Sequence, residues 1–451
     1  MHSQRQGKKV GLVSLGCPKN LVDSEVILGG LIHKDGYVFC QKVEESDIII
    51  INTCGFLEAS KQESIEVIEE ILELKKVGSC KAVIVIGCLV QRFSSQLKER
   101  FKEVDAFLDA SHLEDVGDVI ANIFHHEEHF QLPVRKAYLT DHHAPLFRLT
   151  APHYSYIKIS DGCDNPCSFC TIPRIRGRFR SRSITDIIEE TQKRVETGAK
   201  EIILIAQDLT EYGRDIYKKP SLPLLLEEMV KIHSVEWIRL MYTYPYSMSD
   251  GVLECISTYD KICNYVDMPL QHIDQDILTA MGRRGDEQYI RNLINKMYSV
   301  IPNLALRTTF ITGFPGETES QFQRLLDFMA DVCFDRVGIF CYSNELSTRS
   351  VKLPDQVSGE LMRERQRRGM MLQQTISEKN NRKYIGHILR VHCDRRCTDN
   401  GQLYEARSYR DAPEIDGLVF IHDSEKQIKQ GDMMDVRIMD ATQYDLIACK
   451  E

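Results

Sequence analysis

Three cysteines fall within eight residues, in the stretch Cys-Asp-Asn-Pro-Cys-Ser-Phe-Cys that runs from Cys163 through Cys167 to Cys170. Thiolates at this spacing in one loop can reach a single metal centre. Structural zinc prefers four ligands, but the next cysteine is Cys255 and no histidine lies nearby. A four-iron cluster held by three thiolates leaves one iron open to a further ligand. The triplet therefore predicts an iron–sulfur cluster with an open iron, and a zinc loop is the alternative.

A second set of cysteines is dispersed along the amino-terminal part of the chain. Cys17, Cys54 and Cys88 each end a predicted strand, in SLGC, INTC and VIGC, and a glycine adjoins each one. The carboxyl ends of parallel strands gather at one sheet edge, where α/β domains place ligands. Glycine lets the backbone approach a bulky ligand closely. The pattern predicts a second cluster on these cysteines, and three unrelated core cysteines are the alternative.

Composition limits the class of protein that can carry these sites. The chain has 451 residues, too many for one core, and a formal net charge of -9. That net negative charge argues against a protein whose whole surface binds nucleic acid. No apolar run approaches the ~20 residues of a membrane span, and the first residues do not have the pattern of a signal peptide. We expect a cytoplasmic protein, in which fifteen cysteines indicate metal or catalytic roles rather than disulfides.

Residues 1–124 alternate strand and helix signals, and four consecutive isoleucines precede Cys54. Unbroken β-branched runs are typical of strands buried on both faces of a parallel sheet. We therefore expect an amino-terminal α/β domain with a parallel sheet. Residues 125–153 do not show these alternating strand and helix signals and are predicted to form an exposed linker. A metal site is the alternative reading of that segment, on His125, His126, His129, His142 and His143.

Residues 154–357 contain six strand-then-helix repeats, which predict a partial (βα)6 barrel of parallel strands. In such folds the chemistry lies at the carboxyl ends of the strands. Residues 358–382 are polar and predict a helical connector. Residues 383–451 show short strands separated by turn signals, which predict a small antiparallel β module. The predicted fold class is α/β with these three parts in order.

The triplet and its position resemble the radical S-adenosylmethionine (SAM) superfamily, whose mark is CxxxCxxC after the first strand of a partial barrel. The resemblance implies that the open iron binds the amino and carboxylate groups of SAM. One electron then cleaves SAM to a 5′-deoxyadenosyl radical. It also implies that the aromatic residue before the last cysteine, Phe169, packs near the adenine.

Within that superfamily, LGCPKN, NTCGF and IGCLVQR resemble the amino-terminal domain of the methylthiotransferases. The resemblance covers nearly the whole chain and implies an auxiliary cluster on Cys17, Cys54 and Cys88, a radical SAM barrel and a carboxy-terminal TRAM module. Within the barrel, AQDLTEYGRD, MPLQH, MGRRG and TTFITGFPGET are similar to family blocks. The implied cofactors are two 4Fe–4S clusters and SAM. The implied partners are an electron donor of flavodoxin or ferredoxin type and a sulfur donor.

The tail ARSYRDAPEIDGLVFI resembles the branch of this family that modifies ribosomal small-subunit protein S twelve. The branch places a methylthio group on the β-carbon of an aspartate. In this mechanism one SAM supplies the radical, and a second SAM methylates sulfur held at the open iron of the auxiliary cluster. Gln207 and Asp208 end the second barrel strand and Gly313 ends a later one, and within the family these positions are candidates for the SAM-facing rim.

Charge gives a separate indication of the substrate. Residues 383–449 carry nine Lys or Arg and twelve Asp or Glu, a net of -3. An acidic module suits a basic ribosomal protein better than a nucleic acid, so no stable nucleic-acid partner is expected. Asp411, Glu414 and Asp416 concentrate that charge and are candidate substrate-binding residues. A solvated acidic turn is the alternative.

Five arginines alternate after the triplet: Arg174, Arg176, Arg178, Arg180 and Arg182. In an extended chain they would share one side, where they could bind an anion, either the SAM carboxylate or the target aspartate. Arg176 and Arg180 are the candidates for substrate binding, and a solvated edge is the alternative. Two other functions remain open at this point: a tRNA adenosine methylthiotransferase of the same family, and a non-enzymatic iron–sulfur scaffold or RNA-binding sensor.

Overall fold

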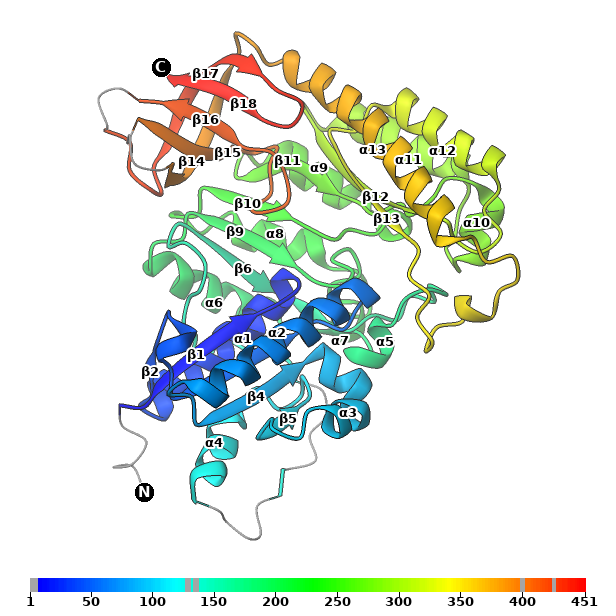
Figure 1. The fold of residues 1–451 in the computed structure, drawn as a ribbon. Helices are drawn as coiled ribbons and strands as arrows, with labels where there is room; N and C mark the ends of the chain where they lie inside the picture. The colour runs from blue at the N-terminus through cyan, green and yellow to red at the C-terminus, as the bar shows by residue number, and fades with distance from the viewer. Residues whose placement is uncertain (1–6, 126–130, 133–137, 398–401, 424–426) are drawn as a thin grey trace. The chain divides into compact units, whose positions relative to one another are not determined.

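The computed structural model describes residues 7–125, 131–132, 138–397, 402–423 and 427–451 (Figure 1). The chain divides into two compact units. The first comprises Met1–Thr150, Lys158–Asp164 and Cys170–Arg182, and the second comprises Ala151–Ile157, Asn165–Phe169 and Ser183–Glu451. The predicted domain boundaries at 124, 153, 357 and 382 stay predictions. Of the linker histidines, His126 and His129 lie outside the described residues.

The first unit contains a five-stranded sheet in the order β2-β1-β3-β4-β5, with every neighbouring pair parallel. The strands are β1 (Lys9–Ser14), β2 (Val38–Phe39), β3 (Ile48–Thr53), β4 (Ala82–Gly87) and β5 (Ala106–Leu108). The isoleucine run lies in β3, where every residue is buried. The parallel amino-terminal sheet is therefore confirmed.

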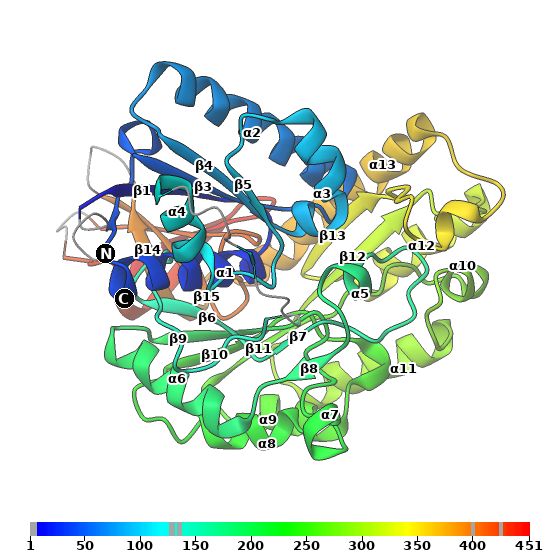
Figure 2. The ribbon, with the colours of Figure 1, turned by 90° about the horizontal axis from the view of Figure 1, so that it is seen from below.

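Helices cover both faces of this sheet (Figure 2). They are α1 (Pro18–Gly29), followed by the π-helical turn η2 (Gly30–Lys34), α2 (Glu58–Val77), α3 (Cys88–Arg100) and α4 (Val116–His125). Ile48 and Ile50 pack in one apolar cluster with residues of α1 and α4. Ile49 and Ile51 pack in another with residues of α2 and α3. The strand is apolar on both faces because each face meets a helical layer.

Shorter elements complete the first unit. They are η3 (Val43–Glu45), β7 (Ser160–Asp161), α5 (Ile172–Ile175) and β8 (Arg180–Ser181). The strands β7 and β8 form an antiparallel pair.

The second unit contains a six-stranded sheet in the order β13-β12-β11-β10-β9-β6. Its strands are β6 (Tyr154–Lys158), β9 (Glu201–Ile205), β10 (Trp237–Leu240), β11 (Ile262–Asp267), β12 (Ala305–Thr312) and β13 (Arg336–Cys341). The pairs from β9 to β13 are parallel. All six predicted barrel strands are present, so the partial barrel is confirmed.

Helices follow these strands along the chain, and α6, α8, α9 and α11 lie along one side of the sheet (Figure 2). The helices are α6 (Ile184–Glu196), α7 (Arg214–Tyr217), α8 (Leu222–Met229), α9 (Asp250–Thr258), α10 (Gln275–Ala280), α11 (Glu287–Val300), α12 (Glu319–Val332) and α13 (Gly359–Arg382), with 3-10 turns η4 (Pro245–Ser247) and η5 (Ser350–Lys352). The predicted helical connector is α13, whose first turn is capped by the Ser358 hydroxyl. Within the described residues, none of the helices has the length and apolar character to cross a membrane.

The carboxy-terminal residues form a small closed barrel in the order β14-β15-β16-β18-β17. Its strands are β14 (Ile388–Arg396), β15 (Leu403–Ser408), β16 (Val419–His422), β17 (Met433–Ala441) and β18 (Leu446–Lys450). The segments HILRVHCD, QLYEARSY, GLVFIH and DMMDVRIMD predict the first four of these strands in chain order, and β18 was missed. Most pairs are antiparallel, as expected, but β16 and β18 pair in parallel.

Buried ion pairs fix this small barrel to the amino-terminal ends of the six-stranded sheet. Glu201, the first residue of β9, is fully buried. It accepts a hydrogen bond from Arg239 Nε at 2.7 Å and forms an ion pair with Arg407 Nη1 at 2.8 Å. Arg407 also bonds Asp394 at 2.7 Å. Burial opposes ionisation of Glu201, but the two arginines outweigh it and hold its pKa well below its usual value. Glu201 is therefore a charged link between the two sheets.

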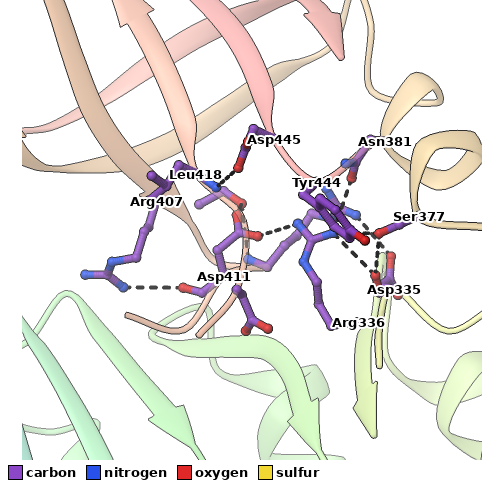
Figure 3. A network of polar contacts seen from close by, with 12 residues as sticks. Asp335, Arg336, Ser377, Asn381, Arg407, Asp411, Leu418, Tyr444 and Asp445 are labelled. Carbon is purple, nitrogen blue, oxygen red and sulfur yellow. Dashed lines mark hydrogen bonds and ion pairs between the residues drawn. The ribbon is translucent and has the colours of Figure 1, made fainter. Parts of the chain in front are cut away.

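The acidic turn of the tail takes part in the same junction (Figure 3). Asp411 is buried and accepts from Arg336 Nη2 at 2.6 Å, while the side chain of Asp416 accepts from the Tyr265 hydroxyl at 2.7 Å and from Arg307 Nε at 3.3 Å. The prediction that these two carboxylates bind a substrate is corrected, because barrel side chains already occupy both of them. Glu414 is exposed, as that prediction requires, and the Tyr154 hydroxyl lies 3.4 Å from its Oε1.

Replacing Glu201 by Gln should destabilise the second unit by about 3–5 kcal/mol, since it leaves the buried Arg239 without its carboxylate and Arg407 with Asp394 alone. The matched control is Glu236→Gln, which removes the partner of Arg390 in a pair whose side chains are 45% and 55% exposed. That change should cost about 0–1 kcal/mol. Urea unfolding followed by the fluorescence of Trp237, the only tryptophan, measures both. Equal effects of the two variants would contradict the role given to Glu201.

Candidate functional site

The three dispersed cysteines follow neighbouring strands of the first unit. Cys17 lies just past β1 and caps α1, Cys54 follows β3 directly, and Cys88 follows β4 and begins α3. Because β1, β3 and β4 are adjacent and parallel, all three cysteines lie at the same edge of the sheet. The amino-terminal ends of α1 and α3 also favour negative charge on Cys17 and Cys88. This edge is the candidate auxiliary site.

Glycines allow the three cysteine turns to meet. Gly16 has φ +90°, and a Cβ there would lie 2.7 Å from Cys54 Cβ and 3.0 Å from Cys54 Sγ. A Cβ on Gly55 would lie 2.7 Å from Leu89 Cα, next to Cys88. Any larger residue would push the cysteine turns apart, so the small residues at this edge are required by geometry.

Asn20 ties the turns to one another. Its Nδ2 donates to Leu15 O and to Thr53 O, both at 3.1 Å, and these carbonyls precede the turns of Cys17 and Cys54. Its Oδ1 lies 3.5 Å from Cys88 Sγ, which donates to it as a thiol. One buried amide therefore contacts all three turns. Sequence reasoning missed Asn20, although it stands in the LGCPKN motif.

The thiols of this edge act on one another electrostatically. Burial raises the pKa of Cys88 to about 11, Arg176 works against that increase, and Cys17 and Cys54 add to it. Burial likewise raises the pKa of Cys54, with Cys17 as a further cause. Metal centres bind the deprotonated thiolate, so loading this site releases protons.

The donor set consists of three cysteine thiols, the ligand type that holds iron–sulfur clusters. In the described parts of the chain, no group of three or more His, Cys, Asp or Glu side chains is arranged to hold one metal ion. A four-iron cluster is several times wider than an ion, so its three thiolates lie farther apart than those of a zinc site. Three soft thiolate donors around glycine-lined turns are the arrangement such a cluster needs.

A buried charge cluster lies beside Cys88. Arg176 donates from Nη2 to Asn20 Oδ1 at 2.7 Å and lies 3.3 Å from Cys88 Sγ, while its Nη1 pairs with Asp23 at 2.6 Å. Lys158 also pairs with Asp23, at 2.6 Å. Arg176 was predicted to bind a substrate anion, but its guanidinium is engaged with groups of the first unit itself. Asp23 and Lys158 were not predicted, since no local spacing marks them.

The other arginines of the alternating run do not form one row. Arg174 and Arg178 are exposed, whereas Arg182 is buried and donates to the Lys158 carbonyl at 3.0 Å. The run is broken because α5 and a turn precede the short strand β8. Arg180, the other substrate-binding candidate, is half-buried and donates to backbone carbonyls, including that of Arg176 at 3.3 Å. With Arg174 it lines a polar pocket of about 210 Å³ in the first unit.

The local triplet has distinct surroundings at each cysteine. In the first unit, the Cys163 N–H donates to Gly177 O at 3.3 Å, and the Ile172 N–H donates to Cys170 Sγ at 3.4 Å. In the second unit, Cys167 Sγ lies 4.0 Å from Arg283 Nη1. Arg283 belongs to the MGRRG motif.

The residues predicted to face SAM lie at the carboxyl ends of the second unit's strands. Asp208 is buried and accepts from Asn165 Nδ2 at 2.7 Å, and burial raises its pKa. Gln207 precedes it and is half-buried. Phe169 packs edge-on against Phe314, with ring centroids 6.4 Å apart. The fourth residue of this set, Gly313, has φ +73° at the end of β12.

A buried carboxylate that sequence reasoning missed fixes the turn after β12. Glu317 accepts from the Gly313 N–H at 2.5 Å, from Arg365 Nη1 at 2.8 Å and faces His272 Nε2 at 3.2 Å. Glu317 is in the GFPGET motif and His272 in MPLQH, so two motifs of the sequence meet here. Their contact joins the two motifs at this end of the sheet.

Comparison with known proteins gives matches for all three parts of the chain. Family models match at residues 9–109 (Uncharacterized protein family UPF0004), 157–329 (Radical SAM superfamily) and 385–449 (TRAM domain). The ribosomal protein uS12 methylthiotransferase RimO of Desulforamulus reducens is 43% identical over 438 residues, which cover 97% of this chain and 98% of that protein. The protein of the same name from Clostridioides difficile is 42% identical over 439 residues, with the same coverage.

Solved structures with a similar fold are more distant in sequence. The radical SAM methyltransferase TsrM from Kitasatospora setae gives a TM-score of 0.55 at 13% identity, covering 74% of this chain and 72% of that one. The cobalamin-dependent radical SAM enzyme OxsB gives a TM-score of 0.52 at 12% identity, covering 73% and 52%. At this identity the likeness concerns the fold alone.

Changing Gly16 to Ala should greatly reduce iron binding at the candidate auxiliary site, because the new methyl group would push Cys54 away from Cys17. The measurement is iron content after anaerobic reconstitution of a chain in which the local triplet, Cys163, Cys167 and Cys170, is replaced by Ala. Without the change, this chain should hold about four irons. Gly30→Ala is the control, since a Cβ there meets nothing within 4 Å. Full iron loading of the Gly16 variant would show that the close approach is not needed.

Proposed function

Because the chain belongs to the RimO family of ribosomal protein uS12 methylthiotransferases, we propose that it adds a methylthio group to the β-carbon of an aspartate in uS12. The observation that carries this conclusion is 43% identity over 97% of the chain to a protein of that name. The enzyme is a radical SAM methylthiotransferase, and it uses SAM and 4Fe–4S clusters. The curated relatives named here are uS12 enzymes rather than tRNA enzymes.

Two sets of cysteines would hold the clusters. The local triplet Cys163, Cys167 and Cys170 would hold the cluster that binds SAM, and Cys17, Cys54 and Cys88 would hold the auxiliary cluster. When bound, the clusters supply the electron that cleaves SAM and an open iron for the sulfur that is transferred. The assignment of the second set is supported by its common sheet edge, the glycine turns and the shared contacts of Asn20.

The chain's own residues would bind and orient the reactants. Phe169 and Gly313 would line the SAM site, with Gln207 and Asp208 at the next strand end. The pKa of Asp208 is raised by burial, so its carboxyl group suits hydrogen bonding to a polar group of the cofactor at the strand ends. The buried Glu317 would hold the Gly313 turn in place through its hydrogen bond to the glycine N–H.

Substrate recognition would draw on charged side chains at the surface. Of the three acidic candidates, Glu414 is the one that lies exposed. The net charge of -3 over residues 383–449 favours a basic protein surface. On the first unit, Arg180 and the polar pocket it lines would receive an anionic group such as the target aspartate.

The reaction needs an electron donor and a source of sulfur. We propose a donor of flavodoxin or ferredoxin type, since both classes work at the low potentials that SAM cleavage demands. The sulfur donor would supply sulfur to the auxiliary site rather than to the SAM site.

Changing Cys163, Cys167 and Cys170 to Ala should abolish SAM cleavage, measured as 5′-deoxyadenosine formed under reducing conditions. Changing Cys17, Cys54 and Cys88 to Ala should leave cleavage in place but stop methylthio transfer, measured by mass spectrometry of a uS12 substrate. Cys40→Ala is the control and should affect neither reaction, because Cys40 lies beside the start of β1 whereas Cys17 follows the end of that strand. Transfer by the second triple variant would rule out the two-cluster assignment.

A strain that lacks this chain should have uS12 lighter by about 46 Da, the mass of one sulfur and one CH2 group. Expression of the intact chain should restore that mass, and a chain carrying Cys54→Ala should not. Intact-mass spectrometry of ribosomal proteins, with nucleoside analysis of tRNA from the same cells, makes the measurement. Unchanged uS12 together with under-modified tRNA adenosine would assign the chain to the tRNA branch instead.

A further inference from the structure

Arg176 is placed so that one end of its guanidinium is anchored and the other meets a cysteine of the auxiliary site. Nη1 pairs with Asp23 Oδ2 at 2.6 Å. Nη2 donates to Asn20 Oδ1 at 2.7 Å and lies 3.3 Å from Cys88 Sγ. The side chain is 5% exposed, so water contributes little to solvating these groups.

The charges around the anchored end balance. Asp23 also accepts from Lys158 Nζ at 2.6 Å, and Asp161 lies 3.3 Å from Lys158 and 3.6 Å from Arg176. Two cations therefore face two carboxylates, all buried. This arrangement fixes the guanidinium by its Nη1 end and leaves the Nη2 end directed at Asn20 and Cys88. A buried charge is retained at this cost only where its partners are well placed.

The direction of the hydrogen bonds at Cys88 depends on whether the sulfur is a cluster ligand. As a thiol, Cys88 donates to Asn20 Oδ1 at 3.5 Å. As a ligand it has no proton to donate and becomes an acceptor. Arg176 Nη2 is then the charged donor that faces the sulfur, and charge-assisted hydrogen bonds are stronger than neutral ones.

We propose that Arg176 is a positioning residue of the auxiliary site, which donates a hydrogen bond to the Cys88 sulfur and thereby raises the reduction potential of the auxiliary cluster. The proposal rests on the proposed function of Cys17, Cys54 and Cys88. Hydrogen bonds to ligand sulfurs and nearby net charge are among the factors that set cluster potentials. A cationic donor stabilises the reduced cluster, which carries one more negative charge, and it weakens electron donation from the sulfur to iron. Arg176 would thereby favour an anionic sulfur ligand at the auxiliary site.

Arginine suits this position because its two ends act on different partners. A lysine has one ammonium group on a flexible stem and cannot pair with Asp23 while also reaching Cys88 in the same planar geometry. Arg176→Lys therefore keeps the buried positive charge for Asp23 but loses the donor to the sulfur. Comparing this variant with the parent therefore measures the effect of the hydrogen bond to the sulfur while the positive charge at position 176 is kept.

The test uses the full chain with the local triplet changed to Ala, so that any cluster signal comes from the auxiliary site. Arg176→Lys is compared with Arg178→Lys, a change at an exposed arginine two residues away. After anaerobic reconstitution, iron content is measured and the midpoint potential is found by electrochemical reduction followed by electron paramagnetic resonance. We expect iron loading similar to the parent, a more negative midpoint potential for Arg176→Lys, and no shift for Arg178→Lys.

A second variant covers the case in which Arg176→Lys does not load iron. Asp23→Asn combined with Arg176→Gln removes one charge of each sign and keeps the cluster of charges neutral. It should load iron and show the same negative shift. A potential equal to that of the parent in any iron-loaded Arg176 variant overturns the proposal. Absence of iron in the parent chain would instead contradict the auxiliary site itself, and with it the role of Arg176.

Discussion

Parallel pairing of β1, β3 and β4 is the constraint on which the auxiliary site depends. Each strand is followed at the same edge by a turn that carries one cysteine, although the three cysteines are spread over about seventy residues of sequence. Antiparallel pairing of any one strand would send its cysteine to the opposite edge. The isoleucine strand β3 lies between β1 and β4. It is fully buried because helices cover both of its faces.

Buried ion pairs connect segments of this protein that lie far apart in the sequence and that no single short motif contains. The segments 158–164 and 170–182, on either side of the central part of the triplet loop, belong to the first unit. They bring Lys158 and Arg176 to Asp23 at the start of the chain. In the second unit, Glu201 and Arg407 link the six-stranded sheet to the small barrel in the same way. In both places removal of one member would leave an uncompensated charge in a buried site.

The sequence was sufficient to predict those strands and helices whose residues follow a regular pattern. The parallel sheet and the six barrel strands follow from apolar patterning, the connector helix from its polar composition, and the local triplet from spacing alone. It was insufficient for β18, because five residues at the end of the chain carry little periodic signal. Composition also revealed acidic charge around Asp411 but not its partner, since Arg336 is 75 residues away in sequence. The prediction that the alternating arginines share one side was wrong. It assumed an extended chain, whereas residues 172–175 form the short helix α5.

We propose that one chain holds two clusters on two separate sets of three cysteines. Anomalous diffraction at the iron edge, from crystals of the anaerobically reconstituted full-length protein, tests it most directly. Two separate iron peaks are expected, one bonded to the sulfurs of Cys163, Cys167 and Cys170 and the other to those of Cys17, Cys54 and Cys88. A single iron peak, or density for a zinc ion at either set, would contradict it.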